Sequence, residues 1–279
     1  IIVVYRGKQM KKLKSFATRH PIVFVVSVVV VWLVVLLVLT AIASEALSKP
    51  YGDVVTTSIS RLITTTCILL LIWRFGWMDS SGIARLGSWQ VWLIALGGII
   101  YFSGASLNSF YGEVSFDFSY LIRSTSAHST VITHFIISLC EEIMFRGLVL
   151  YSLIHVWGDT KKGVIGSVVL TSLLFAIPHM MQVFTSGVSI PSILVLILEG
   201  SIVSIWWGAM VLWGGSIWPA VMVHFFGNAV VAVQGLVTPM IEPDILAYKR
   251  LIIFSLLLGV LGFVLLFQTT PGRIMNEVP

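Results

Sequence analysis

Long runs of apolar residues recur along the chain, and they constrain its fold more than any other feature. The first, residues 21–43, consists largely of Val and Leu. Runs of similar length follow at 56–76, 88–108, 130–153, 163–186, 191–213, 216–236 and 249–268. About 20 helical residues cross the hydrocarbon core of a bilayer, and backbone groups in lipid must be bonded internally. The sequence therefore predicts an all-α polytopic membrane protein with about eight transmembrane helices.

The composition excludes a soluble globular domain. Of the 279 residues, 57% are hydrophobic and only 10% are charged, and the mean hydropathy is +1.00. Soluble domains carry roughly 25% charged residues, so this chain lacks the polar residues that would face water. Its expected surroundings are the lipid bilayer. The two cysteines, Cys67 and Cys140, both lie in apolar runs, which indicates neither a disulfide framework nor a zinc cluster.

The basic residues are distributed unevenly around the apolar runs. Six of them precede the first run: Arg6, Lys8, Lys11, Lys12, Lys14 and Arg19. If the N-terminus is cytoplasmic, eleven basic residues fall in inside segments and four fall outside. The positive-inside rule then predicts a multi-pass protein of the cell membrane with both termini in the cytoplasm. A basic tail beside an apolar run is explained as a topology signal, so we expect no nucleic-acid partner.

The chain divides accordingly into three parts. Residues 1–20 are a basic cytoplasmic N-terminal segment, residues 21–268 are an eight-helix transmembrane domain, and residues 269–279 are a C-terminal tail. No internal repeat and no separate soluble domain are visible in the sequence.

The fourth apolar run contains ionisable residues at a depth where they are costly. Glu141, Glu142 and Arg146 lie within 130–153, and a charged residue at the centre of a membrane helix costs roughly 2.5–3.5 kcal/mol. Glu142 and Arg146 are four residues apart, so they share a helix face and can pair. Glu141 points about 100° away from Glu142. We therefore predict that Glu141 is the less neutralised acid and a candidate general base.

Two further runs carry polar residues at a similar predicted depth. His179 follows Pro178, which tends to kink a helix, and His224 and Asn228 are four residues apart on one face. At 1.5 Å per residue, Glu141 and Asn228 lie about 18 Å from the inner ends of their spans and His179 about 24 Å. These depths agree within the uncertainty of the span ends. The sequence therefore predicts a polar site inside the membrane, formed by three helices.

These residues form three motifs, Glu-Glu-x-x-x-Arg at Glu141, Phe-x-x-x-His at Phe175 and His-x-x-x-Asn at His224. In this order on separate membrane helices, they resemble the CPBP family of CAAX-processing and bacteriocin-processing proteases, also called Abi proteins. The resemblance covers about residues 130–230, the motif core. It implies an eight-helix fold, an intramembrane endopeptidase activity, and a peptide or membrane-protein substrate such as a prenylated CAAX tail.

The resemblance also implies roles for individual residues. The residue matching Glu141 is the base that activates a water molecule together with the one matching His179. The residues matching His224 and Asn228 stabilise the oxyanion, and Glu142 and Arg146 correspond to a supporting pair. This chemistry is reasonable without the family, because peptide hydrolysis needs a base, an orienting imidazole and donors to the developing negative charge.

Several alternatives stay open at this level. Glu141, His179 and His224 could bind a divalent metal such as zinc, although we favour a mechanism without a cofactor because Asn is a poor zinc ligand. A proton-coupled transporter could use the same acids and histidines as a relay. A non-catalytic bacteriocin-immunity or scaffold protein could also retain the motifs. Arg61 and Glu199, in two other apolar runs, are either partners of each other or residues that line a polar cavity.

Overall fold

The computed structural model describes residues 2–46, 52–181, 189–239 and 245–270, and these residues contain helices but no strand. The predicted tail lies outside the described residues from 271 onward, as do residues 182–186 of the predicted fifth span. The helices are α1 (Ile2–Arg19), α2 (Pro21–Ala46), α3 (Gly52–Phe75), α4 (Trp89–Tyr111), α5 (Phe118–Arg123), α6 (Thr125–Glu142), η1 (Ile143–Leu150), α7 (Tyr151–Trp157), α8 (Lys161–Ala176), η2 (Ile177–Met181), α10 (Ile190–Gly214), α11 (Trp218–Gln234) and α12 (Ile245–Gln268).

Each predicted membrane span coincides with a helix or a continuous set of helices. Among the described residues, six segments are long and apolar enough to cross a membrane: Pro21–Ala46, Val54–Phe75, Trp89–Tyr111, Lys161–Met181, Ile190–Gly214 and Tyr248–Gln268. Trp218–Gln234 is a shorter apolar helix. The predicted span 130–153 falls on α6, η1 and α7, which follow one another without a break. The prediction of an all-helical membrane protein is confirmed, and a count of about eight spans is compatible with this arrangement.

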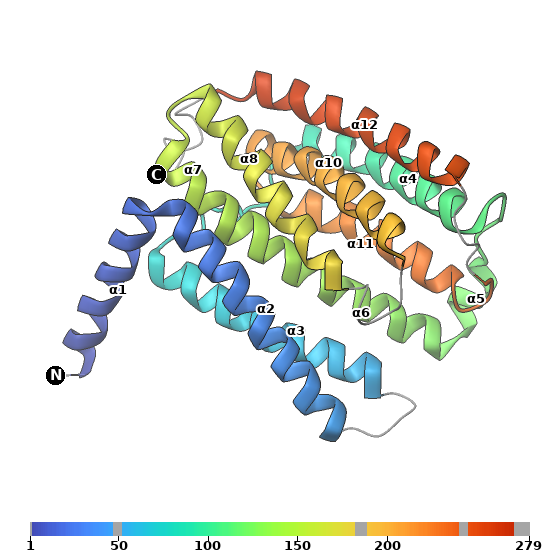
Figure 1. Cartoon of the computed structure of the whole chain (residues 1–279), viewed down its shortest axis with the longest axis horizontal. Coiled ribbons are helices and arrows are strands. Elements are labelled where there is room, and N and C mark those ends of the chain that lie inside the picture. Colours follow the sequence, from blue (N-terminus) through green and yellow to red (C-terminus); the bar gives the residue numbers. More distant parts are fainter. Residues whose placement is uncertain (1, 47–51, 182–188, 240–244, 271–279) are drawn as a thin grey trace.

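The helices pack as a bundle with the continuous α6–η1–α7 segment near its middle (Figure 1). α11 packs between α4 and α6, and α10 packs against α8 and α12. α2 and α3 lie side by side along one edge, and α3 also contacts α6. The helices that carry the two acids, Arg146, His224 and Asn228 therefore lie inside the bundle, whereas η2, which carries His179, has no buried residue.

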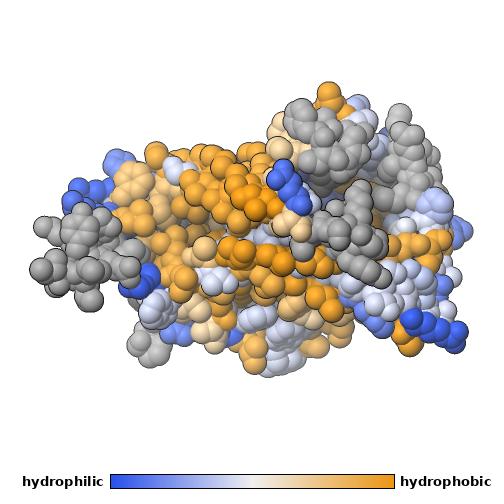
Figure 2. Space-filling model, turned by 90° about the horizontal axis from the view of Figure 1, so that it is seen from below, coloured by the Kyte–Doolittle hydropathy of each residue, from blue (hydrophilic) through white to orange (hydrophobic). Residues whose placement is uncertain are grey.

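Apolar side chains cover much of the outer surface, as expected for a protein in lipid. A wide hydrophobic band crosses the middle of the face in Figure 2, and hydrophilic residues lie mostly toward its two ends. α2 contributes large exposed apolar residues such as Val30, Val31 and Val34. α10 is the most buried of the candidate spans, with 50% of its most apolar window covered by the protein against 28% for α2.

A short connection between α3 and α4 fixes the start of α11. Ile217 N donates to Gly82 O at 3.2 Å, Trp218 Nε1 donates to Ile83 O at 3.0 Å, and Ser216 Oγ donates to Arg85 O at 2.6 Å. Gly87 allows the close approach, since its φ is +78° and a Cβ atom there would lie 2.8 Å from Gly214 O. This contact orients the helix that carries His224 and Asn228.

A close approach of the α10 and α12 backbones leads to a first prediction. A Cβ atom on Gly262 would lie 2.8 Å from Trp206 Cα and 3.0 Å from Trp206 N. Since the obstacle is backbone, Gly262→Ala is expected to push the helices apart and lower the free energy of unfolding by about 1–3 kcal/mol. Unfolding in detergent, followed by circular dichroism, measures this loss. Gly97→Ala is the matched control, because a Cβ atom there meets nothing within 4 Å; an equal loss in both variants would contradict the prediction.

Candidate active site

The two adjacent acids lie at the end of α6 in different surroundings. Glu142 has a fully buried side chain, and its Oε1 accepts hydrogen bonds from Arg146 Nη1 at 3.0 Å and from His224 Nδ1 at 2.9 Å. The side chain of Glu141 is 17% exposed, and its closest charged neighbour is His224, with Nε2 3.7 Å from Glu141 Oε2. The pairing predicted for Glu142 and Arg146 is thus present, and Glu141 is the acid that can be reached from the cavity described below.

Arg146 is held on three sides in the centre of the bundle. Besides its bond to Glu142, its Nη2 donates to Ser204 Oγ at 2.7 Å. The guanidinium also lies over the rings of Phe175, 4.7 Å from the centroid, and Trp207, 5.2 Å from the centroid. Arginine can bind an acid and stack on an aromatic ring at the same time, because the N–H donors of the guanidinium lie in its plane and leave its two faces free. Arg146 therefore connects α10 and the end of α8 to the acid pair.

His224 lies between the two carboxylates and is fixed in orientation. Its ring stacks on Trp207, with centroids 4.6 Å apart and planes 19° apart, and meets the Phe175 ring at 82°. A carboxylate can only accept, so His224 Nδ1 carries the proton that is donated to Glu142. Nε2 is therefore the nitrogen directed at Glu141, and its state decides whether it donates or accepts there.

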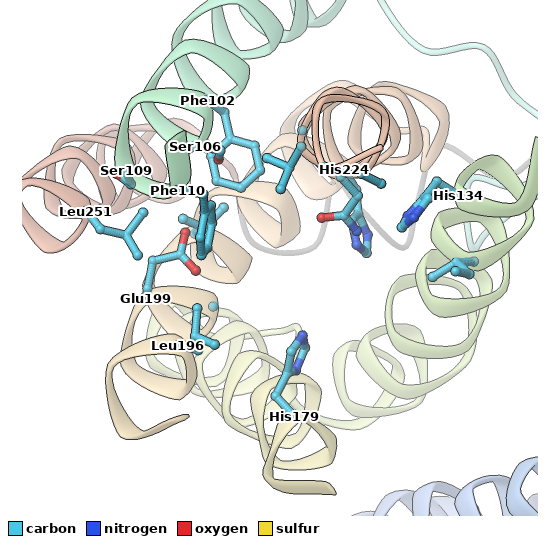
Figure 3. Close-up of a pocket in the computed structure, with 18 of the residues that line it drawn as sticks. Phe102, Ser106, Ser109, Phe110, His134, His179, Leu196, Glu199, His224 and Leu251 are labelled. Carbon is cyan, nitrogen blue, oxygen red and sulfur yellow. The ribbon is translucent and has the colours of Figure 1, made fainter. Parts of the chain in front are cut away.

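His179 and Asn228 are the two remaining predicted residues, and both line the same cavity as Glu141. α8 ends at Ala176, and His179 lies in the following 3-10 turn, which contains Pro178. His179 Nδ1 is buried without a hydrogen-bond partner among the described residues. In Figure 3 the rings of His179 and His224 point toward each other across the cavity. Within the described residues, no ion pair joins His179 to either acid.

The cavity has a volume of about 900 Å³ and extends well beyond these residues. α3, α4, α6, α10, α11 and α12 all contribute to its walls. Arg61 and Glu199, which the sequence left as mutual partners or lining residues, both line it, and no ion pair joins them among the described residues. Sites for small molecules span about 300–1,000 Å³, so the cavity has room for a short peptide segment.

The residues considered for a metal do not fit one. In the described part of the chain, no three His, Cys, Asp or Glu side chains are gathered closely enough to hold a metal ion. Glu141 and His224 lie close together, with 3.7 Å between Oε2 and Nε2, but His179 faces His224 from across the cavity (Figure 3). We therefore derive no step through a metal.

Sequence reasoning missed several residues that shape the site. Trp207 and Ser204 of α10 hold His224 and Arg146, yet one tryptophan among ten and one serine among many carry no distinctive signal. The π-helix η1, which begins directly after Glu142, was also not predicted. π-helical segments occur frequently at functional sites, but the sequence of residues 143–150 has no pattern that predicts a π-helix.

Comparison with known proteins addresses the segment that holds this cluster. A family model described as type II CAAX prenyl endopeptidase Rce1-like matches residues 123–230. No significant match is found among curated proteins, and none among solved structures. The matched residues contain Glu141, Glu142, Arg146, His179, His224 and Asn228. The resemblance to the CPBP family is therefore confirmed over residues 123–230, the segment that is similar to the type II CAAX prenyl endopeptidases.

Proposed function

We propose that the chain is an intramembrane endopeptidase that hydrolyses a peptide bond inside the 900 Å³ cavity. The observation that carries the proposal is the position of Glu141. Its carboxylate is reachable from the cavity, has no arginine partner among the described residues, and lies 3.7 Å from His224 Nε2. A carboxylate that is not paired with arginine can take a proton from water without first giving up an arginine partner.

In the proposed reaction, Glu141 takes a proton from a water molecule that His179 orients. The water oxygen attacks the carbonyl carbon of the scissile bond, and the carbonyl π electrons move to its oxygen. His224 Nε2–H and the Asn228 amide donate hydrogen bonds to this oxyanion. When the C–N bond breaks, the leaving nitrogen takes the proton held by Glu141, and Glu141 returns to its starting state.

Glu142 and Arg146 support His224 in this scheme. His224 donates to the oxyanion only when both ring nitrogens carry protons, and the resulting positive charge needs compensation. Glu142, whose Oε1 lies 2.9 Å from Nδ1, supplies it. Arg146 in turn balances Glu142 and keeps its carboxylate in place. This geometry supports a positioning role for the pair.

The proposed substrate is a peptide or the tail of a membrane protein. The cavity wall combines apolar rings and aliphatic chains, such as Phe102, Phe110 and Leu196, with the polar residues described above. Such a wall suits a peptide with apolar side chains, and a prenylated CAAX tail is one such substrate. The test is cleavage of a peptide library that includes prenylated CAAX peptides by the purified full chain in lipid nanodiscs. Cleavage supports the proposal, and absence of cleavage of every peptide would contradict it.

The proposed oxyanion donor gives a second prediction in the same assay. Asn228→Ala is expected to lower kcat by about 10²–10³-fold with little change in KM, because a donor to the oxyanion acts mainly in the transition state. Asn108→Ala, on α4 and not among the residues that line the cavity, is the control. A loss that appears in KM alone would remove Asn228 from the oxyanion site.

A further inference from the structure

A second acid, Glu199, lines the cavity away from the catalytic cluster. It lies in the middle of α10, and its carboxylate points into the cavity beside the ring of Phe110 and on the opposite side from His224 and His134 (Figure 3). The proposed hydrolysis does not use it. An acid at this depth in a membrane-spanning helix is costly and usually marks a functional site.

Glu199 has no cationic partner among the described residues. Within the described part of the chain, Arg61 of α3 is the one Lys or Arg that lines the cavity. Arg61 lies on the α6 side of the cavity, since Ser58 Oγ and Thr133 Oγ1 are 3.1 Å apart, and Thr64 Oγ1 and Cys140 Sγ are 3.5 Å apart. No cationic side chain of the described residues is therefore placed to pair with Glu199.

Two hydroxyl groups that line the cavity, those of Ser109 and Tyr111, can accept hydrogen bonds but have no proton left to donate. Ser109 Oγ donates its proton to Ala105 O at 2.8 Å, and Tyr111 Oη donates to Val231 O at 2.7 Å. Each hydroxyl has one proton, so the remaining lone pairs of Ser109 and Tyr111 are left to accept hydrogen bonds.

We propose that the Glu199 end of the cavity is a subsite for a positively charged side chain of the substrate, the ammonium of lysine or the guanidinium of arginine. The carboxylate neutralises the charge, the hydroxyl oxygens accept its N–H groups, and the Phe110 ring offers its face to it. An anionic group would meet the carboxylate and these acceptors, and a neutral apolar group would leave the carboxylate unpaired. The subsite rests on the proposed peptidase function, which it narrows to substrates with one basic residue near the cleaved bond.

The test compares peptides that differ in one charge. The peptides are nonapeptides of Leu and Ala with a neutral fluorophore at the N-terminus. Each peptide has a single lysine, placed at a different position in each one. Each is compared with a matched peptide that has acetyl-lysine at the same position. Wild type in nanodiscs is expected to cleave the lysine peptide with at least about tenfold higher kcat/KM at one position or two adjacent ones, mainly through KM. In Glu199→Gln this ratio falls to about one, whereas in Glu113→Gln, an exposed acid outside the bundle, it stays as in wild type.

Binding separates failure of the subsite from failure of the peptidase. The dissociation constants of the same peptides, by fluorescence anisotropy, are compared for Glu141→Gln and for Glu141→Gln/Glu199→Gln, which need no cleavage. The subsite is supported if Glu141→Gln binds the lysine peptide about tenfold more tightly than the acetyl-lysine peptide and the double variant binds both equally. This result would support the subsite even if wild type cleaves nothing. Equal binding of both peptides by Glu141→Gln, or a preference that survives in the double variant, overturns it. Should Glu199→Gln fail to fold, Phe110→Leu is expected to lower the lysine preference several-fold, and an unchanged preference there overturns the subsite.

Discussion

Glu141→Gln is expected to lower the rate of peptide cleavage by about 10²–10⁴-fold, the usual contribution of a general base. Glutamine keeps the size of the side chain and its polarity but cannot take a proton from water. His224 remains bonded to Glu142 through Nδ1, so the surrounding helices keep their contacts. The measurement is kcat in nanodiscs, with the dissociation constant of the peptide and the unfolding midpoint as controls for binding and folding.

The outcome of this variant also decides between the proposed function and its competitors. Loss of cleavage with unchanged peptide binding identifies Glu141 as a residue of the chemical step. Full cleavage by Glu141→Gln would exclude it as the base. If a cell that carries Glu141→Gln keeps the biological activity of the protein, the non-catalytic immunity or scaffold function gains support. If wild type cleaves nothing but carries an ion flux that Glu141→Gln loses, the transporter is favoured.

The largest expected effect on stability belongs to Arg146→Met. The substitution leaves Glu142, whose side chain is fully buried, without its arginine partner. Removing one member of a buried ion pair costs about 3–5 kcal/mol, because the other charge stays buried and uncompensated. The free energy of unfolding in detergent is expected to fall by that amount. Arg123→Met, at an exposed arginine of α5, is the matched control and is expected to change it little.

A double variant separates the loss of the pair from the loss of packing. In Glu142→Gln/Arg146→Met both charges are gone, and replacing both members of a buried pair is often close to neutral. The double variant is therefore expected to recover most of the stability lost in Arg146→Met. If it is as unstable as the single variant, the contacts of Arg146 with Ser204 and the two aromatic rings outweigh the ion pair.

The membrane spans could be predicted from the sequence because their signal is local. A run of about 20 apolar residues predicts a membrane-spanning helix without any information about the rest of the fold. The Glu142–Arg146 pair was predictable for the same reason, since four residues along one helix set its geometry. The contact between Glu142 and His224 could not be predicted, because it depends on how α6 and α11 are rotated about their own axes. That rotation is set by contacts far away in the sequence, such as those of Ile217 and Trp218 with the α3–α4 connection.

The depth of a residue in the membrane can be estimated from the sequence, but depth alone does not determine which residues are in contact. Residues at similar depth on different helices can face one another or face lipid. Their predicted depth puts His179 and Asn228 near the acids, and both do line the cavity. Depth alone does not determine whether Arg61 and Glu199 pair, and in the structure they lie apart, on different helices around one cavity.

The π-helix η1 has a consequence for how the sequence of this protein can vary. All eight of its residues, 143–150, are buried, so the segment has no side that faces lipid. On α2, by contrast, exposed valines can exchange with other apolar residues without disturbing a neighbour. Tolerance to substitution on α2 should therefore rise and fall with the helical repeat, while in 143–150 it should be low at every position. Residues 143–150, directly after Glu142, should therefore accept few amino-acid substitutions at any position, and this should hold in relatives with different substrates.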